Sequence, residues 1–256
     1  NQKDLFSRRY NFLFSFLFLL KQDPILAHHD LKTKIVEEKI VALGISSTGV
    51  PGEGNYVIHQ IDLNGETIKT IENRNEGGIS NSFLDSIGDL YVGSNNLGFM
   101  VTKINIQGDT VWQFEEPLID NNNAGNIVFT EDKEGYVYFS GFHVNNESAD
   151  ILTIKLDTSG NLMWKSRFDY ENMLLDEWAT EINVDENYVY VIGTTIMEND
   201  NWDNTIIVYS IGNGDEIVSS KYDFASIDRA ESITTQDEFI YVTGRSDNGS
   251  QSPAFL

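Results

Sequence analysis

The chain has 256 residues, including 40 Asp or Glu and 17 Lys or Arg, which gives a formal net charge of −23 at pH 7. Such an acidic surface repels nucleic acid and anionic lipid, so we expect neither as a partner. The sequence contains no Cys, which excludes disulfides, thiolate metal ligands and a Cys nucleophile. Its length allows one or two domains, or one array of repeats, with a sizeable core.

The first 28 residues differ from the rest. An apolar run, Asn11–Leu20, follows Arg8 and Arg9 and precedes the small residue Ala27. A basic flank, a short apolar core and a later small residue are the layout of a secretory signal. The run is too short to span a bilayer, which needs about 20 apolar residues. We therefore predict that residues 1–28 are signal-peptide-like or disordered. We also predict a secreted or cell-surface location without stable membrane insertion.

From residue 29 onward, short runs of alternating apolar and polar residues predict β-strands, and no stretch keeps a helical period. Strands that end in glycine recur every 48 to 52 residues, at Gly44, Gly93, Gly141, Gly193 and Gly244. Hairpin glycines recur at spacings of 43 to 54, at Gly65, Gly108, Gly160 and Gly214. The two markers independently indicate a repeat of about 50 residues.

Each repeat predicts four strands, which in the third copy are Ala124–Asp132, Tyr136–Val144, Ile151–Leu156 and Leu162–Asp169. In the fourth copy the third strand is predicted to begin at Thr205. Tandem four-stranded units of this length are typical of β-propeller blades. We predict an all-β fold, a propeller of four-stranded antiparallel blades with about four and a half blades present. The predicted blades cover residues 29–73, 77–117, 124–170, 176–223 and 229–256, the last one incomplete.

Several residue types suit this architecture. The hairpin glycines provide positive φ for tight turns, and the strand-end glycines allow close backbone approach near a central axis. Trp112 and Trp164 each follow a hairpin glycine by four residues, and we expect them to pack as wedges between blades. The third strand of the third copy is apolar on both faces, with Leu152, Ile154 and Leu156 on one side and Ile151 on the other.

The stretch Asp150–Tyr170, DILTIKLDTSGNLMWKSRFDY, resembles the SBBP repeat of β-propeller proteins. The matching residues are Asp150, Leu156, Asp157, Gly160, Asn161 and Trp164. The Trp does not occur in every copy of the repeat, because Lys69 and Val218 occupy the corresponding positions of the first and fourth copies. The resemblance implies an extracytoplasmic propeller within a secreted or surface protein, and it implies no catalytic residues.

Two other propeller repeats fit less well. Repeats that bind pyrroloquinoline quinone share the G-x-x-x-W spacing, but they usually place Thr before the glycine and Lys or Arg after it. Here Gln107 and Asp109 flank Gly108, and Ser159 and Asn161 flank Gly160. The sialidase Asp-box places its aromatic residue three positions after the glycine rather than four. The sequence therefore argues against both repeats.

The weakest candidates for metal ligands are Asp120, Asn122 and Glu131, which fit the spacing of a calcium loop, with Ala124 where Asp or Asn is expected. That loop lies between helices, whereas Asn126–Thr130 predicts a strand. We therefore expect an ordinary loop and no cofactor, with Ca²⁺ as the alternative.

Other polar residues carry no clear pattern of a site. The four histidines are far apart and offer no convergent ligand set: His28, His29, His59 and His143. The acidic loop Glu198–Asn204 contains an exposed Trp202 that could bind a cation or stack on a sugar. A solvated loop is the plainer interpretation.

No catalytic signal is present. Neighbouring carboxylates such as Asp176/Glu177 and Asp132/Glu134 are expected by chance among 40 acidic residues, and no G-x-S-x-G elbow occurs. We predict a non-catalytic extracytoplasmic propeller that acts as a binding or scaffold module for a protein or glycan. The alternative is a polysaccharide-active propeller enzyme with acidic and aromatic residues at the mouth of the channel, since propellers concentrate ligands there.

Overall fold

The structure, a computed structural model, describes residues 32–36, 39–47, 54–62, 64, 66–75, 79–94, 98–117, 124–144, 148–170, 175–197, 201–224, 226–236, 239–247 and 254–255. The signal-like segment of residues 1–28 lies outside these ranges. None of the described residues forms an α-helix, so none of them belongs to a helix able to cross a membrane.

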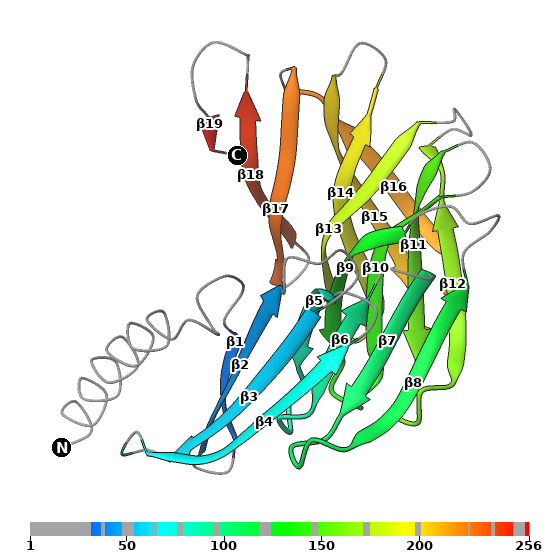
Figure 1. The fold of residues 1–256 in the computed structure, drawn as a ribbon. Helices are drawn as coiled ribbons and strands as arrows, with labels where there is room; N and C mark the ends of the chain where they lie inside the picture. The colour runs from blue at the N-terminus through cyan, green and yellow to red at the C-terminus, as the bar shows by residue number, and fades with distance from the viewer. Residues whose placement is uncertain are drawn as a thin grey trace.

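Three four-stranded antiparallel sheets are followed along the chain by a seven-stranded sheet, whose first four strands form a fourth blade (Figure 1). Blade 1 consists of β1 (Lys32–Val36), β2 (Lys39–Ser47), β3 (Gly54–Asp62) and β4 (Thr67–Asn75). Blade 2 consists of β5 (Ile79–Leu84), β6 (Leu90–Ser94), β7 (Gly98–Ile104) and β8 (Thr110–Pro117). Blade 3 consists of β9 (Ala124–Glu131), β10 (Val137–Val144), β11 (Ala149–Leu156) and β12 (Leu162–Phe168). Blade 4 consists of β13 (Asp176–Val184), β14 (Tyr188–Ile196), β15 (Trp202–Ser210) and β16 (Glu216–Tyr222).

A further antiparallel group, blade 5, consists of β17 (Ile227–Gln236), β18 (Phe239–Asp247) and β19 (Ala254–Phe255). It joins blade 4 through one parallel bridge between Trp202 and Ile227. The predicted all-β fold of four-stranded antiparallel blades is confirmed.

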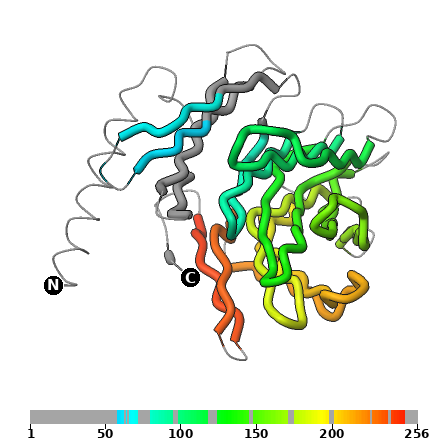
Figure 2. The backbone as a smooth tube through the Cα atoms, turned by 90° about the horizontal axis from the view of Figure 1, so that it is seen from below, coloured from blue at the N-terminus to red at the C-terminus, as the bar shows by residue number. Residues whose placement is uncertain are grey.

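The first strands of successive blades contact one another, β1 with β5, β5 with β9, β9 with β13 and β13 with β17. Figure 2 shows blades 3, 4 and 5 side by side, in green, yellow and orange. The strands β4, β8, β12 and β16 form the other edge of their blades. The core fills the spaces between the faces of neighbouring blades. The strand β11 is buried along its whole length. Leu152, Ile154 and Leu156 pack with Tyr91 and other residues of blade 2, and Ile151 packs with residues of blade 4. The two-sided burial predicted for this strand is confirmed.

Four of the glycines that were predicted to end strands lie within the second strand of their blade, opposite a bulge in its first strand: Gly93, Gly141, Gly193 and Gly244. The register between β10 and β9 shifts around Gly141, and that between β14 and β13 shifts around Gly193. A Cβ added to Gly141 would lie 2.5 Å from the carbonyl oxygen of Gly125, and one on Gly193 would lie 2.5 Å from that of Trp178. The predicted close backbone approach is therefore confirmed, and the approaching backbone is the adjacent strand.

The hairpin between β11 and β12 shows why its sequence is so specific. Asp157 Oδ1 accepts hydrogen bonds from the backbone N–H groups of Ser159 and Asn161, at 2.9 and 2.8 Å. Gly160 has a φ of +83°, which suits glycine best. Asn105 accepts two backbone hydrogen bonds in the same way in the β7–β8 hairpin. Three of the six residues that carry the likeness to the SBBP repeat thus form this turn: Asp157, Gly160 and Asn161.

The two tryptophans join successive blades, as predicted. Trp112 Nε1 donates to the carbonyl oxygen of Thr158 at 3.1 Å, and Trp164 Nε1 donates to that of Ile211 at 3.1 Å. Trp164 is 7% exposed. Lys69, which takes the place of Trp in blade 1, donates from Nζ to the carbonyl oxygen of Gln107 at 2.9 Å. The hydrogen bond between blades therefore persists where the ring is absent.

Each tryptophan ring also lies against the hairpin glycine of the following blade. A Cβ added to Gly160 would lie 2.6 Å from Trp112 Cδ2, and one added to Gly214 would lie 2.6 Å from Trp164 Cε3. These glycines are required both for the turn and for the space that the ring occupies.

We predict that Gly160→Ala lowers the free energy of unfolding by about 2–4 kcal/mol, because it adds a left-handed alanine and an overpacked contact. Gly212→Ala is the matched control, since the nearest atom to its new Cβ is the Ser210 hydroxyl oxygen at 3.9 Å. It should change stability by no more than about 0.5 kcal/mol. Urea unfolding of both variants measures the difference, and equal midpoints would contradict the prediction.

Candidate functional site

The hairpins that join the first and second strands of each blade gather at one end of the molecule. Asp132 Oδ1 accepts from the N–H groups of Glu134 and Tyr136, both at 3.0 Å, and its Oδ2 accepts from the Tyr138 hydroxyl at 2.7 Å. Asp185 repeats this in the next blade, with Oδ2 accepting from the Tyr190 hydroxyl at 2.6 Å. Burial and the adjacent carboxylate raise the pKa of both tyrosines. These two aspartates are therefore committed to shaping the turns.

A cleft of about 670 Å³ lies between the hairpins of blades 3 and 4. Five of its lining residues carry carboxylates and one carries an ammonium group. The lining residues are Glu131, Asp132, Lys133, Glu134, Val184, Asp185, Glu186, Asn187, Ile211 and Thr235. We call this the hairpin cleft. Its strongly negative lining favours a cationic ligand.

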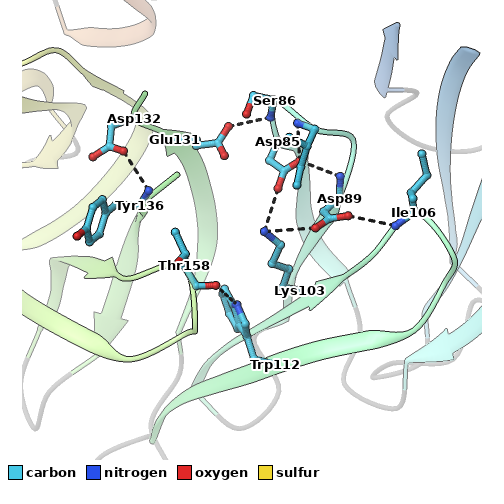
Figure 3. Close-up of polar contacts among 11 residues, drawn as sticks. Asp85, Ser86, Asp89, Lys103, Ile106, Trp112, Glu131, Asp132, Tyr136 and Thr158 are labelled. Carbon is cyan, nitrogen blue, oxygen red and sulfur yellow. Dashed lines mark hydrogen bonds and ion pairs between the residues drawn. The ribbon is translucent and has the colours of Figure 1, made fainter. Parts of the chain in front are cut away.

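The charged side chains of the hairpin cleft differ in how accessible they are to a ligand. Glu131 Oε2 accepts a hydrogen bond from the backbone N–H of Ser86 at 2.8 Å, which joins blade 3 to the β5–β6 turn of blade 2 (Figure 3). Lys133 and Glu186 form an ion pair of 2.8 Å across the cleft, but both side chains are largely exposed. Such exposed pairs contribute little stability and separate easily. Glu134 and Glu186 are therefore the carboxylates most available to a ligand.

Lys103 occupies a different environment in blade 2. Its Nζ lies 3.0 Å from Asp85 Oδ2 and 3.4 Å from Asp89 Oδ2, as Figure 3 shows, and 4.9 Å from the centre of the Tyr91 ring. The Asp85 side chain is fully buried and that of Lys103 is 10% exposed. Burial raises the pKa of Tyr91 to about 12, so this phenol stays neutral at physiological pH. This group is a buried ion pair that supports the turn.

Of the three calcium-loop candidates, the structure describes Glu131. Asp120 and Asn122 lie outside the described residues. Glu131 is the last residue of β9, a strand that begins at Ala124, in agreement with the strand predicted over Asn126–Thr130.

The described histidines lie in different blades. His28 and His29 lie outside the described residues. His59 is in β3, where its Nδ1 lies 3.1 Å from Thr70 Oγ1. His143 is 1% exposed in β10; its Nε2 lies 3.1 Å from the Pro117 carbonyl oxygen and its Nδ1 lies 3.1 Å from an Arg167 nitrogen. The structure does not bring these two side chains together.

The expectation of an exposed Trp202 is wrong. Residues 198–200 lie outside the described ranges, and Trp202, Asp203 and Asn204 belong to β15. Trp202 is half-buried, because its ring meets the edge of Trp178 with centroids 5.7 Å apart and the Arg229 guanidinium lies 4.5 Å from its centre. This tryptophan therefore packs against its own protein and is a poor platform for a sugar.

Glu177 is the most perturbed carboxyl group that the structure describes. It is fully buried at the start of β13, close to Asp150 and Asp169. Burial raises the pKa of Glu177 to about 8; a hydrogen bond from the Tyr170 N–H opposes this rise, and repulsion from the neighbouring aspartates adds to it. The sequence places Glu177 only next to Asp176, so its contacts with distant carboxylates could not be read from local spacing.

Comparison with known proteins identifies the architecture. The chain is similar to quinohemoprotein alcohol dehydrogenase ADHIIG from Pseudomonas putida HK5, with a TM-score of 0.54 and 11% identity over 84% of this chain and 38% of that chain. It is also similar to extracellular domains 1–2 of Drosophila semaphorin 1b, with a TM-score of 0.51 and 12% identity over 91% of this chain and 53% of that chain. The chain has a β-propeller fold. It spans little more than half, or less, of the length of these structures. No protein-family model and no curated protein sequence matches it.

We predict that Lys103→Met lowers the free energy of unfolding by about 3–5 kcal/mol, because the buried Asp85 charge loses its ammonium partner. Lys165→Met is the control, since its partner Glu116 lies at 2.7 Å but Lys165 is 47% exposed. That variant should lose at most about 1 kcal/mol. Urea unfolding compares the two, and a loss at Lys103 as small as that at Lys165 would contradict the buried pair.

We also predict that Glu177 makes stability depend on pH. The unfolded pKa is about 4.3, so between pH 5 and 8 the folded state keeps a proton that the unfolded state releases. Stability should therefore fall as pH rises through this range, by at most about 1.4 kcal/mol per pH unit. Urea unfolding in buffer with EDTA at pH 5.5 and pH 8 measures the fall. Glu177→Gln should flatten it, whereas Glu216→Gln, at an exposed position, should not. Equal slopes for all three chains would refute the assignment.

Proposed function

We propose that this chain is part of a secreted or surface-exposed β-propeller of the SBBP-repeat type that serves as a non-catalytic binding or scaffold module. The main support is how its recurrent polar residues are used. Asp132, Asp157 and Asp185 accept backbone hydrogen bonds within turns, and Trp112 and Trp164 join blades. The residues that repeat therefore maintain the scaffold, which leaves the variable side chains between hairpins for recognition.

We propose the hairpin cleft as the binding surface and a basic segment of a protein as its ligand. Glu134 and Glu186 supply accessible carboxylates, and the ion pair between Lys133 and Glu186 can open when a competing ammonium or guanidinium group arrives. The overall charge of −23 would attract such a partner over longer distances at low ionic strength.

The alternative, a polysaccharide-active enzyme, expects acidic and aromatic residues together at a channel mouth. The described residues that line the hairpin cleft supply carboxylates but no aromatic ring. The two similar structures are an alcohol dehydrogenase and a pair of extracellular semaphorin domains, so the fold alone suits either class. The composition of the cleft favours binding.

A fluorescent oligolysine peptide provides a direct test of the cleft. We expect Glu134→Gln combined with Glu186→Gln to weaken binding several-fold at low salt, because two accessible charges are lost. Glu66→Gln, an exposed change in blade 1, should leave affinity unchanged, and added salt should reduce the difference. Fluorescence anisotropy measures the affinities.

Equal effects of the cleft and control variants would show that binding follows net charge alone and would reject the cleft as the site. Polysaccharide hydrolysis that a single carboxylate substitution abolishes would reject the non-catalytic function.

A further inference from the structure

Carboxylates also meet at the opposite end of the blades, where the fourth strand of one blade leads to the first strand of the next. Between blades 3 and 4, Asp150 of β11, Asp169 after β12 and Glu177 of β13 converge. One oxygen of each lies within 4.8 Å of the others. Asp150 and Glu177 are fully buried. We call this group the first junction.

The same arrangement recurs one blade later. Asp203 of β15, Asp223 after β16 and Asp228 of β17 also place one oxygen each within 4.8 Å of the others. Asp150 pairs with the residue two positions beyond Gly141, and Asp203 pairs with the residue two positions beyond Gly193. The second junction is therefore the structural repeat of the first.

Among the described residues, the fourth strand of the preceding blade supplies one basic side chain to each junction, at equivalent positions of β12 and β16. Arg167 lies 2.9 Å from Asp150, and Lys221 lies 2.6 Å from Asp203. In each junction the described residues thus supply three carboxylates and one cationic side chain, which pairs with one of the three. This imbalance is costly for the groups that are buried.

The third carboxylate is oriented by the backbone in both junctions. Tyr170 N–H donates to Glu177 Oε1 at 3.4 Å, and Phe224 N–H donates to Asp228 Oδ2 at 2.6 Å. Among the described residues, the other oxygen of Glu177, Oε2, has no hydrogen-bond partner although it is buried. A buried polar oxygen without a partner, on a side chain that converges with two other carboxylates, indicates that a positive ligand completes the group.

We propose that each junction binds one divalent cation, with Ca²⁺ as the ion that the chemistry favours. All converging ligands are oxygens, as Ca²⁺ prefers, and no Cys or His belongs to either set. Ca²⁺ binds oxygens at about 2.3–2.6 Å, so ligands on opposite sides of the ion lie up to about 5 Å apart. The observed spacing is compatible with a shared ion. In each junction the carboxylates outnumber the basic side chains of the described residues by two, which matches the two positive charges of Ca²⁺.

Blade 2 provides an internal comparison. Gly93 pairs with Val101 in blade 2, as Gly141 pairs with Leu152 in blade 3. Phe99, two residues before Val101, therefore occupies the position of Asp150. Phe114, which pairs with Val101, occupies the position of Arg167. Both phenylalanines pack into the core between blades 2 and 3. Asp150 and its basic neighbour are therefore exchanged together for apolar residues, whereas Glu116 stands at the position of Asp169. The joint exchange indicates that Asp150 and Arg167 act as one unit.

Bound Ca²⁺ would connect three strands across two blades. In the first junction it would join β11 and the end of β12 to β13, and so fix blade 4 against blade 3. The proposal concerns the end of the blades away from the hairpin cleft and does not depend on the ligand proposed there.

Calorimetric titration of the EDTA-treated chain with CaCl₂ tests the proposal. We expect two Ca²⁺ per chain, weaker binding of Mg²⁺, and a rise in Tm of roughly 5–10 °C for each site at one hundred times its Kd. Glu177→Gln and Asp228→Asn should each remove one of the two sites. Glu216→Gln, an exposed change on β16, should retain both.

Gln and Asn match the size of the side chains that they replace and add no charge to the group, so we expect both variants to fold, and far-ultraviolet circular dichroism checks this. If Ca²⁺ neither produces heat nor raises Tm, the proposal is overturned. It is also overturned if Glu177→Gln and Asp228→Asn both keep two sites. A chain whose stability responds to pH but not to Ca²⁺ would show that the junctions hold a proton instead.

Discussion

The contact between a tryptophan ring and the hairpin glycine of the next blade is the interaction on which this stack of sheets most depends. A four-stranded sheet with two apolar faces cannot bury both alone, so it needs a neighbour in a defined position. Trp112 and Trp164 each make two contacts that fix this position. The ring packs against the hairpin glycine of the next blade, and Nε1 donates a hydrogen bond to the same hairpin. Because Gly160 belongs to the same hairpin as Thr158, the local turn and the long-range contact are specified by one short segment.

The sequence was sufficient to predict the repeat and most strands because both depend on local chemistry. Asp157 and Gly160 identify the D-x-x-G turn, and the alternation of apolar and polar residues identifies the strands beside it. The third strands were predicted to begin at Ile151 and Thr205, but they begin at Ala149 and Trp202. The error has a physical cause, since Asp is depleted in strands and Asp150 and Asp203 therefore read as loop residues.

The first junction was harder to predict than the hairpins, because its members come from separate strands. Glu177 looked like one of many chance neighbours of another carboxylate, and only the fold brings it to Asp150 and Asp169. A signal did exist in the sequence. Arg167–Tyr170 reads R-F-D-Y and Lys221–Phe224 reads K-Y-D-F, at a spacing close to the blade repeat. That pattern becomes visible only after the blades have been aligned, because each segment alone resembles the polar end of an ordinary strand.

The two ends of the blades use acidic residues in opposite ways. At the hairpin end, Asp132 and Asp185 are surrounded by N–H and hydroxyl donors, which stabilise their charge locally, while Glu134 and Glu186 face solvent. At the junctions, two buried carboxylates converge with a third, which is half-buried in Asp169 and exposed in Asp223, beside one basic side chain among the described residues. Self-repulsion in a chain of this charge disfavours the compact state. The junctions therefore lower its stability unless a proton or a cation neutralises them, and ionic conditions should affect the packing of blades 3 to 5 more than that of blades 1 to 3.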